Sequence, residues 1–298
     1  MDFSGVYPAL TTPFAADDSV SLTDLKHNIE QYNRVSLAGY VVIGSTGESV
    51  LLSWAEIERI LATVKERAAA GKKLIAGTGV ESTAETIVRT KRAAELGYDA
   101  ALVKTPYYYK PAYKPEAYIA HYRRVADASP IPVLLYSVPQ FTGVALEAAE
   151  VATLSEHPNI IGIKESSGNV QRVAEIINAT PRDFQVLVGS AGTLFASMVL
   201  GARGGILALA SALPEKCVEL YELTRKGQHE AARELQAALM KASKRVVAEA
   251  GIAGVKFVME QRGYRGGVPR LPLQPLHHEQ KKCLSELVAA FEPAAARV

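Results

Sequence analysis

Short runs of apolar residues alternate along the chain with longer segments whose apolar positions repeat with a helical period. The short runs are apolar on both faces, which is typical of parallel strands covered by helices on two sides. The pattern predicts strands over residues 6–10, 40–43, 74–76, 100–103, 133–136, 160–163, 186–188 and 206–209. Strands that alternate with helices in this way predict a (β/α)8 barrel that ends near Ala212.

Capping residues place the starts of several helices. Ser53-Trp54-Ala55-Glu56 has the pattern of a capping box and predicts a helix that runs to about residue 69. Ser82 or Thr83 can cap a helix over 84–96. Pro115 fits the first turn of a helix that runs to about residue 127.

The last part of the chain has a different pattern. After the eighth predicted strand no strand-like run follows, and helices are predicted over 214–226, 229–250, 252–262 and 276–290. No linker separates this part from the strands before it. We therefore expect a catalytic barrel over residues 1–213 and a helical extension over 214–298 that packs on it.

Charge and composition exclude several kinds of partner. Lys and Arg number 33 against 31 Asp and Glu, whereas nucleic acids and anionic membranes are bound by a basic surplus on one face. The uncharged stretch 184–202 is long enough to cross a bilayer, but its glycines and polar residues predict a strand, a turn and a helix. Cys217 and Cys283 form no disulfide or zinc motif, and the N-terminus has no signal-peptide pattern, so we expect a cytoplasmic protein.

In barrels of this kind the chemistry lies at the C-terminal ends of the strands, and three such ends carry hydroxyl groups. The second leads into Gly44-Ser45-Thr46-Gly47-Glu48, which can leave amides free to bind a carboxylate; an ordinary glycine turn is the alternative. The fourth leads into Tyr107, Tyr108 and Tyr109, which can equally be packing residues at a half-buried surface. The fifth ends in Tyr136, which either lies at the barrel mouth or is hydrogen-bonded in the core.

The sixth predicted strand, 160–163, is followed directly by Lys164. Burying an ammonium group without a partner is costly, so a lysine inside the barrel mouth tends to lose its proton. The neutral amine is the nucleophile that forms a Schiff base with a carbonyl substrate. A lysine at the rim, paired with Glu165, is the alternative.

Other chemistries have less support in the residue pattern. The six histidines show none of the spacings of a metal site, so we do not expect a metal-dependent aldolase or amidohydrolase. The glycine-rich segment 201–205 resembles a phosphate loop but precedes the eighth strand, which places it on the opposite face. Gly77-Thr78-Gly79 lacks the third glycine and the acidic residue of a dinucleotide-binding motif.

Three motifs taken together resemble one superfamily. They are Gly44-Ser45-Thr46-Gly47-Glu48, Tyr136-Ser137-Val138-Pro139 and Gly162-Ile163-Lys164-Glu165. In this order they resemble the dihydrodipicolinate synthase and N-acetylneuraminate lyase superfamily, and the likeness extends over essentially the whole chain. The resemblance implies a class I aldolase that handles pyruvate through a lysine Schiff base, on a (β/α)8 barrel with a C-terminal helical extension.

The resemblance also implies roles for individual residues. Lys164 matches the Schiff-base lysine, and Tyr136 matches the tyrosine that shuttles protons. Ser45 and Thr46 match the pair whose hydroxyls and amides hold the pyruvyl carboxylate.

Further matches concern the pocket and a proton relay, in which Ser45 and Tyr108 would pass protons to and from Tyr136. Tyr108, with Tyr107 as the alternative, matches a tyrosine that a second subunit supplies to the relay, which implies a homo-oligomer (a dimer or a tetramer of dimers). Gly189 and Leu207 match positions that line the pocket.

The subfamily depends on residues near the second substrate. Dihydrodipicolinate synthases have an arginine where this chain has Phe141, and its loss removes charge-assisted bonds to the carboxylate of aspartate semialdehyde. Sialate lyases have acidic residues just after the seventh strand, which hold the hydroxyl groups of the sugar. This chain has no acidic residue in Gly189-Ser190-Ala191-Gly192. The closest resemblance is to 4-hydroxy-2-oxoglutarate aldolase of the mitochondrial type, which also has a serine at the position of Ser166. Thr46 and Phe141 depart from that enzyme, because it has asparagine at both positions.

We therefore expect retro-aldol cleavage of 4-hydroxy-2-oxoglutarate to pyruvate and glyoxylate, without a metal or other cofactor. Condensation of pyruvate with aspartate semialdehyde is the alternative, and cleavage or dehydration of a 2-keto-3-deoxy sugar acid is a second. The competing class is a relative that binds 2-oxoacids without catalysis.

Overall fold

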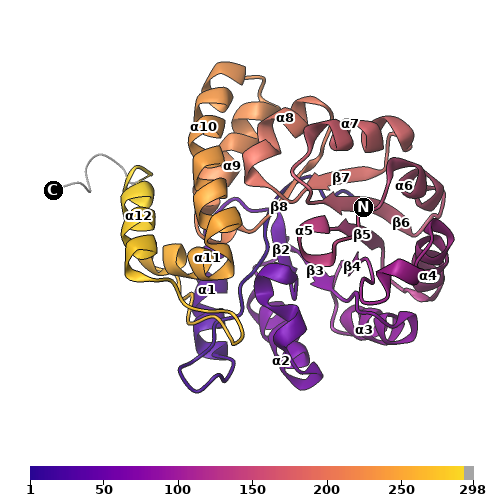
Figure 1. Cartoon of the computed structure of the whole chain (residues 1–298), viewed down its shortest axis with the longest axis horizontal. Helices are drawn as coiled ribbons and strands as arrows, with labels where there is room; N and C mark the ends of the chain where they lie inside the picture. Colours follow the sequence, from indigo (N-terminus) through magenta and orange to yellow (C-terminus); the bar gives the residue numbers. More distant parts are fainter. Residues whose placement is uncertain (292–298) are drawn as a thin grey trace.

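The computed structural model describes residues 1–291, and within them eight parallel strands form a barrel surrounded by helices (Figure 1). The strands are β1 Gly5–Pro8, β2 Gly39–Val42, β3 Lys73–Gly77, β4 Ala100–Lys104, β5 Val133–Ser137, β6 Ile160–Glu165, β7 Gln185–Val188 and β8 Gly204–Leu207. They pair in the order β1-β8-β7-β6-β5-β4-β3-β2. The barrel closes between β1 and β2, where the amide of Ala38 donates to Val6 O at 3.0 Å and that of Leu10 donates to Val41 O at 2.9 Å. The predicted (β/α)8 fold is confirmed.

The helices begin where the sequence provides caps. They are α1 Leu22–Tyr32, α2 Trp54–Arg67, α3 Thr83–Glu95, α4 Pro115–Ala128, α5 Pro139–Thr142, α6 Ala148–Ser155, α7 Val170–Ala179, α8 Leu194–Val199, α9 Pro214–Arg225, α10 His229–Ala242, α11 Gly251–Gln261 and α12 His278–Ala289. Ser53 and Glu56 form the predicted capping box of α2, since each side chain accepts from the other's backbone amide. Ser82 caps α3, and Pro115 is the first residue of α4, as predicted.

Alternation along the strands divides the apolar core into two layers. One cluster fills the barrel interior and includes Leu102 on β4, Leu134 on β5, Leu187 on β7 and Ile206 on β8. The other contains the outward-facing strand residues, which pack against the helices. Every second residue of a strand therefore faces the barrel axis, and the last such residues lie at the barrel mouth.

The bounds of several predicted elements differ from the structure by one or two residues, among them the first strand, which ends at Pro8 rather than at residue 10, and two differences change the picture. β8 begins and ends two residues before the predicted strand 206–209, because the chain turns into a short 3-10 helix at Leu209–Ser211. The helix predicted over 229–250 is divided: α10 ends at Ala242, and Ser243–Glu249 is wound as a π-helix before Gly251 starts α11. The segment 184–202 contains β7 and α8, and none of the helices in residues 1–291 is long and apolar enough to cross a membrane.

The C-terminal helices bring the end of the chain back to the barrel. α9 packs against α8 and β1, so it takes the place of the eighth barrel helix. α10, α11 and α12 lie together on one side of the molecule (Figure 1). The loop between α11 and α12 reaches the N-terminal segment, where Phe14 and Val268 form an antiparallel bridge. The division at residue 213 stays a prediction, and the last seven residues of the predicted extension, 292–298, lie outside the described residues.

Candidate active site

Three polar side chains stand in one row across the barrel mouth. Lys104 on β4 is in register with Tyr136 on β5, which is in register with Lys164 on β6. Leu102 and Leu134, two residues earlier on β4 and β5, lie in the barrel interior, so Lys104 and Tyr136 face the barrel axis as well. The C-terminal end of the barrel thus has a lysine on either side of one phenol.

The amine of Lys164 is buried beside this phenol. The residue is 4% exposed, and its amine lies 4.3 Å from the centre of the Tyr136 ring. Within residues 1–291 the amine has no carboxylate partner, because Glu165 turns to the other side of β6 and lies 3.6 Å from Arg172. Burial raises the pKa of Glu165, although that carboxylate accepts a hydrogen bond from the amide of Ser167. The alternative of a rim lysine paired with Glu165 is therefore wrong.

A hydroxyl of the loop after β2 completes the cluster. The oxygens of Ser45 and Tyr136 are 3.2 Å apart, within hydrogen-bonding distance. Ile43 and Glu48, on either side of the loop, have φ of 62° and 57°, in the left-handed region that a β-branched residue rarely adopts. Backbone strain of this kind is concentrated at functional sites, where the surrounding structure holds it in place.

The same loop is a tight turn that two backbone hydrogen bonds close. The amides of Gly47 and Glu48 bond back to Gly44 O and Ser45 O, each at 3.1 Å. Ser45 and the half-buried Thr46 are not the donors of these two bonds, so their amides are the candidates for holding a carboxylate.

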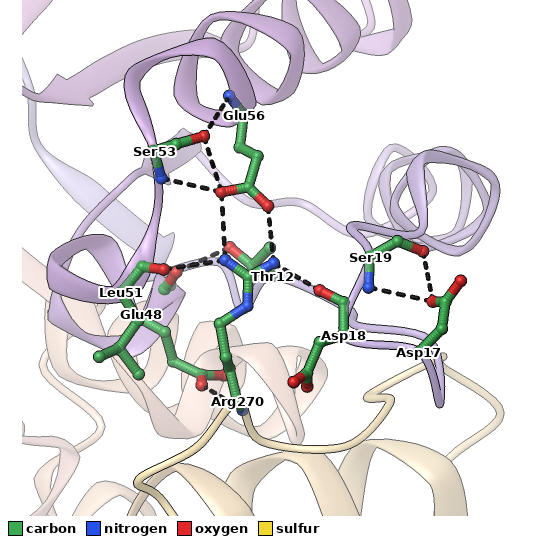
Figure 2. Close-up of polar contacts among 10 residues, drawn as sticks. Thr12, Asp17, Asp18, Ser19, Glu48, Leu51, Ser53, Glu56 and Arg270 are labelled. Carbon is green, nitrogen blue, oxygen red and sulfur yellow. Dashed lines mark hydrogen bonds and ion pairs between the residues drawn. The ribbon is translucent and has the colours of Figure 1, made fainter.

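The C-terminal part of the chain holds this turn through Glu48. The Glu48 carboxylate is buried and lies 2.6 Å from the amine of Lys256 on α11, which is buried as well. Its second oxygen accepts from the backbone amide of Arg270 at 2.8 Å (Figure 2). Removing one partner from a buried pair costs about 3–5 kcal/mol, because the other charge stays buried without compensation. The turn that carries Ser45 therefore depends on residues far along the chain.

The guanidinium of Arg270 ties the same region to α2. Figure 2 shows it against both carboxylate oxygens of Glu56, at 2.6 and 3.1 Å. It also donates to Leu51 O at 2.8 Å and to Asp18 O. Hydrogen bonding to Arg270 lowers the pKa of Glu56 to about 2. This bidentate ion pair fixes the loop 263–275 against the N-terminal end of α2.

The structure brings two of the remaining predicted pocket residues together and leaves a third apart. A Cβ at Gly189 would lie 1.8 Å from the hydroxyl oxygen of Ser166, so only glycine fits there. That hydroxyl is buried without a hydrogen-bond partner in the described residues. The side chain of Leu207 lies in the outer layer against the helices, because its neighbour Ile206 takes the inward position of β8. Leu207 thus presents no side chain to the barrel interior, and its place among the pocket-lining residues stays a prediction.

A cavity of about 320 Å³ adjoins the row at the barrel mouth, and we call it the mouth cavity. Its walls come from the loops after β2, β4 and β5 and from the C-terminal part of the chain, and they include Ser45, Tyr107, Phe141, Ile252 and Leu273. Phe141 is 68% exposed at the rim. Of the described residues that line the cavity, Lys104 alone is a lysine or arginine.

Tyr108 lies outside this cluster. It is 71% exposed, and its ring packs edge-on against Tyr109 with the ring centres 5.0 Å apart. Its amide and that of Tyr107 donate to Glu81 at 2.9 and 3.0 Å. Tyr107, the alternative, is half-buried and lines the mouth cavity. Within one chain, Tyr108 therefore makes no contact with Ser45, and its predicted role requires a second subunit.

The sequence of this chain is similar to those of one family of known proteins. It matches the dihydrodipicolinate synthetase family over residues 2–291. The chain belongs to this family. Members of the dihydrodipicolinate synthetase family are lyases that work through a lysine Schiff base, and this chain is accordingly a lyase of the class I aldolase type.

Individual relatives cover nearly the whole chain. A 4-hydroxy-tetrahydrodipicolinate synthase from Exiguobacterium sp. is 39% identical over 274 residues, which are 92% of this chain and 93% of the relative. The crystal structure of the dihydrodipicolinate synthase DapA-2 from Bacillus anthracis is 29% identical, with a TM-score of 0.93 and coverage of 98% and 100% of the two chains. The dihydrodipicolinate synthase from Acinetobacter baumannii complexed with pyruvate is 32% identical, with a TM-score of 0.92 and coverage of 97% and 98%. These names match the alternative reaction of the sequence analysis rather than cleavage of 4-hydroxy-2-oxoglutarate.

Two features of this family member were missed in the sequence analysis. Lys104 follows the apolar run 100–103 in the same way that Lys164 follows 160–163, so the same reasoning could have selected it. The pairing of Glu48 with Lys256 joins residues far apart in the sequence, and no local pattern predicts it.

Proposed function

We propose that the protein forms a Schiff base between Lys164 and pyruvate or a pyruvate-type 2-oxoacid. We further propose that it makes or breaks a carbon–carbon bond to an aldehyde that carries a carboxylate. The observation that supports this is the buried Lys164 amine, without a carboxylate partner in the described residues, 4.3 Å from the Tyr136 ring. The pyruvate complex of the Acinetobacter baumannii relative supports the same class of substrate.

The reaction follows from these groups. The Lys164 amine attacks the keto carbon, and the carbinolamine loses water to give an iminium, which accepts electrons from the adjacent carbon. Loss of a proton from the methyl group gives an enamine, whose carbon attacks the aldehyde carbon while the aldehyde oxygen takes up a proton. Water then cleaves the new iminium and releases the product and the free amine. Cleavage of a 4-hydroxy-2-oxoacid is the same sequence in reverse.

The neighbouring side chains supply proton transfer and orientation. The Tyr136 hydroxyl, 3.2 Å from Ser45, is placed to move protons to and from the carbinolamine and the aldehyde oxygen. The amides of Ser45 and Thr46 hold the carboxylate of the 2-oxoacid, which fixes its keto carbon against Lys164.

The first candidate for the second substrate is aspartate semialdehyde. The relative with 39% identity is named 4-hydroxy-tetrahydrodipicolinate synthase, and it covers 92% of this chain. This reaction is condensation of pyruvate with the semialdehyde.

Cleavage of 4-hydroxy-2-oxoglutarate is the second candidate, and one observation favours it. Phe141 lies at the rim of the mouth cavity, where the resemblance gives the synthases an arginine for the semialdehyde carboxylate. A 2-keto-3-deoxy sugar acid finds less support, because the outer walls of this cavity are formed largely by apolar side chains, among them Val138, Ile252 and Leu273.

Trapping with borohydride tests the Schiff base. Incubation with pyruvate and borohydride should reduce one pyruvyl adduct onto Lys164, identified by mass spectrometry of the peptide, and Lys164→Ala should give none. The Lys164→Ala variant keeps the amine of Lys104, so it also controls for unspecific trapping, which would label Lys104. Assays of pyruvate release from 4-hydroxy-2-oxoglutarate and of pyruvate consumption with aspartate semialdehyde then separate the two candidates. Absence of an adduct on Lys164 in the folded protein would contradict the proposal.

We also propose that catalysis needs no metal or other cofactor. Among residues 1–291, no three or more His, Cys, Asp or Glu side chains are grouped so that they could hold a metal ion. The activity should therefore be unchanged after dialysis against EDTA, measured beside a sample to which the removed divalent ions are returned. A loss that added metal reverses would contradict this.

A further inference from the structure

Lys104 places a second amine in the barrel mouth, where the Schiff-base reaction as described has no use for it. Its neighbour in register is Tyr136, and its amine lies 5.9 Å from the centre of the Tyr107 ring. Its side chain lines both the mouth cavity and a small recess shared with Ser45 and Tyr136. The side chain of Lys104 therefore borders the space beside Tyr136.

The amine of Lys104 has no carboxylate partner in the described residues. Lys256 shows how this fold stabilises a buried lysine, with a carboxylate 2.6 Å away. Lys104 has no ion pair within the described residues, and its hydrogen bond to Gly79 O, at 2.6 Å, uses one of three donors. Burial lowers the pKa of Lys104, and the charge of Glu81 opposes this change. A substrate carboxylate bound at the Lys104 amine would raise its pKa, as Glu81 does, and would accept hydrogen bonds from its two remaining N–H groups.

The mouth cavity offers a carboxylate no other lysine or arginine. Phe141 occupies the rim position at which the resemblance gives an arginine to the synthases, and of the described residues that line the cavity only Lys104 is a lysine or arginine. In this chain the cation that lines the cavity therefore stands at the end of β4, whereas the resemblance gives the synthases one in the loop after β5.

The spacing of the strands suits this arrangement. Neighbouring strands lie about 4.8 Å apart, so the backbones of Lys104 and Lys164, with β5 between them, are roughly 10 Å apart. Both residues take inward positions of the barrel, on either side of Tyr136, so a short-chain substrate bound to Lys164 extends past Tyr136 toward Lys104 in the proposed arrangement.

We propose that Lys104 is a specificity-determining residue, whose ammonium group binds the carboxylate of the aldehyde partner. The inference rests on the proposed function, because it assigns the binding site of the second substrate in that reaction.

The test compares aldehydes of equal length with and without a carboxylate, in condensation with pyruvate. The pairs are glyoxylate with acetaldehyde, and succinic semialdehyde with butyraldehyde. The wild type should prefer the carboxylated member of at least one pair. Lys104→Met should lower kcat/KM for that member about 10- to 100-fold, the size expected for one charged hydrogen bond, mainly through KM. Its kcat/KM for the uncharged member should stay within about 2-fold, and Lys104→Arg should retain much of the preference.

Two controls separate this role from a structural one. Lys110→Met removes an exposed lysine from the same loop and should change neither pair. Borohydride trapping of pyruvate on Lys164 should be as efficient in Lys104→Met as in the wild type, which also shows that the variant is folded.

Each other outcome overturns the inference. An equal loss for both members of a pair, an unchanged preference, or loss of the pyruvate adduct in Lys104→Met would show that Lys104 does not select the carboxylate. A wild type without an adduct on Lys164 refutes the proposed function itself. A wild type that forms the adduct while Lys104→Met keeps the preference refutes the role of Lys104 alone.

Discussion

Three buried or half-buried lysines in this protein differ in what surrounds their amines. Lys256 is paired with Glu48 at 2.6 Å and serves to hold a loop. Lys164 and Lys104 face the barrel mouth without a carboxylate partner in residues 1–291, on either side of Tyr136. An unpaired buried amine is unfavourable for folding, and it is useful where a substrate supplies the missing partner.

At the same scale, the hydroxyl of Tyr136 can be tested apart from its ring. Tyr136→Phe keeps the ring beside Lys164 and removes the oxygen that lies 3.2 Å from Ser45. If the hydroxyl transfers protons, kcat should fall about 10²- to 10⁴-fold while the thermal unfolding midpoint changes little.

The matched variant for this experiment is Ser45→Ala. The double variant should lose much less than the product of the two single losses, because the two hydroxyls act as one relay. A Tyr136→Phe enzyme with the kcat of the wild type would refute the relay.

At the scale of elements, the sequence predicted every strand, because each is an apolar run between turn residues. It misplaced β8 and missed the π-helix at Ser243–Glu249, since both depend on how neighbouring elements pack rather than on local pattern. At the site, the run 160–163 followed by Lys164 left two positions open, inside the barrel mouth or at its rim, and the structure, in which Lys164 lies within β6 and is buried, decides for the first. The outward orientation of Leu207 was not evident, because an apolar run that is buried on both faces does not show which of its side chains face the barrel axis.

The contact between α3 and α4 gives a stability prediction. His121 on α4 is 6% exposed and lies 2.9 Å from the hydroxyl of Thr83 on α3. Burial lowers the pKa of His121 from 6.5 to about 4, helped by Lys104 and opposed by Glu81. The unfolded chain therefore takes up this proton at a higher pH than the folded protein. Stability is fully present above pH 6.5 and falls as the pH approaches 4, by about 3 kcal/mol in total.

Urea unfolding at pH 7.5 and 4.5 measures this effect. The free energy of unfolding should drop by about 2–3 kcal/mol more in the wild type than in His121→Gln, which has no titrating ring. Subtracting the drop in His121→Gln from that in the wild type removes the contributions of the other titrating groups, which the two proteins share. Equal drops in the two proteins would show that His121 is protonated freely in the folded state.

At the scale of the whole molecule, the exposure of Tyr108 predicts an oligomer. If a second subunit supplies this side chain to the relay, Lys164→Ala and Tyr108→Ala should each be inactive alone. Chains mixed during refolding should regain roughly a quarter of the wild-type activity, because half of the symmetric dimers are then mixed and each has one intact site. Sedimentation of the wild type should show no active monomer.

The buried pair of Glu48 and Lys256 has a consequence for how this enzyme can be altered. The turn to which we assign the substrate carboxylate is held by an ion pair between Glu48 and the amine of Lys256 on α11, far along the chain. A gene shortened after the last strand would therefore lose a catalytic support along with its tail, and its product should be inert even with every reacting group in place. Conversely, substitutions in α11 offer a way to change the affinity for the substrate without altering any residue of the barrel mouth.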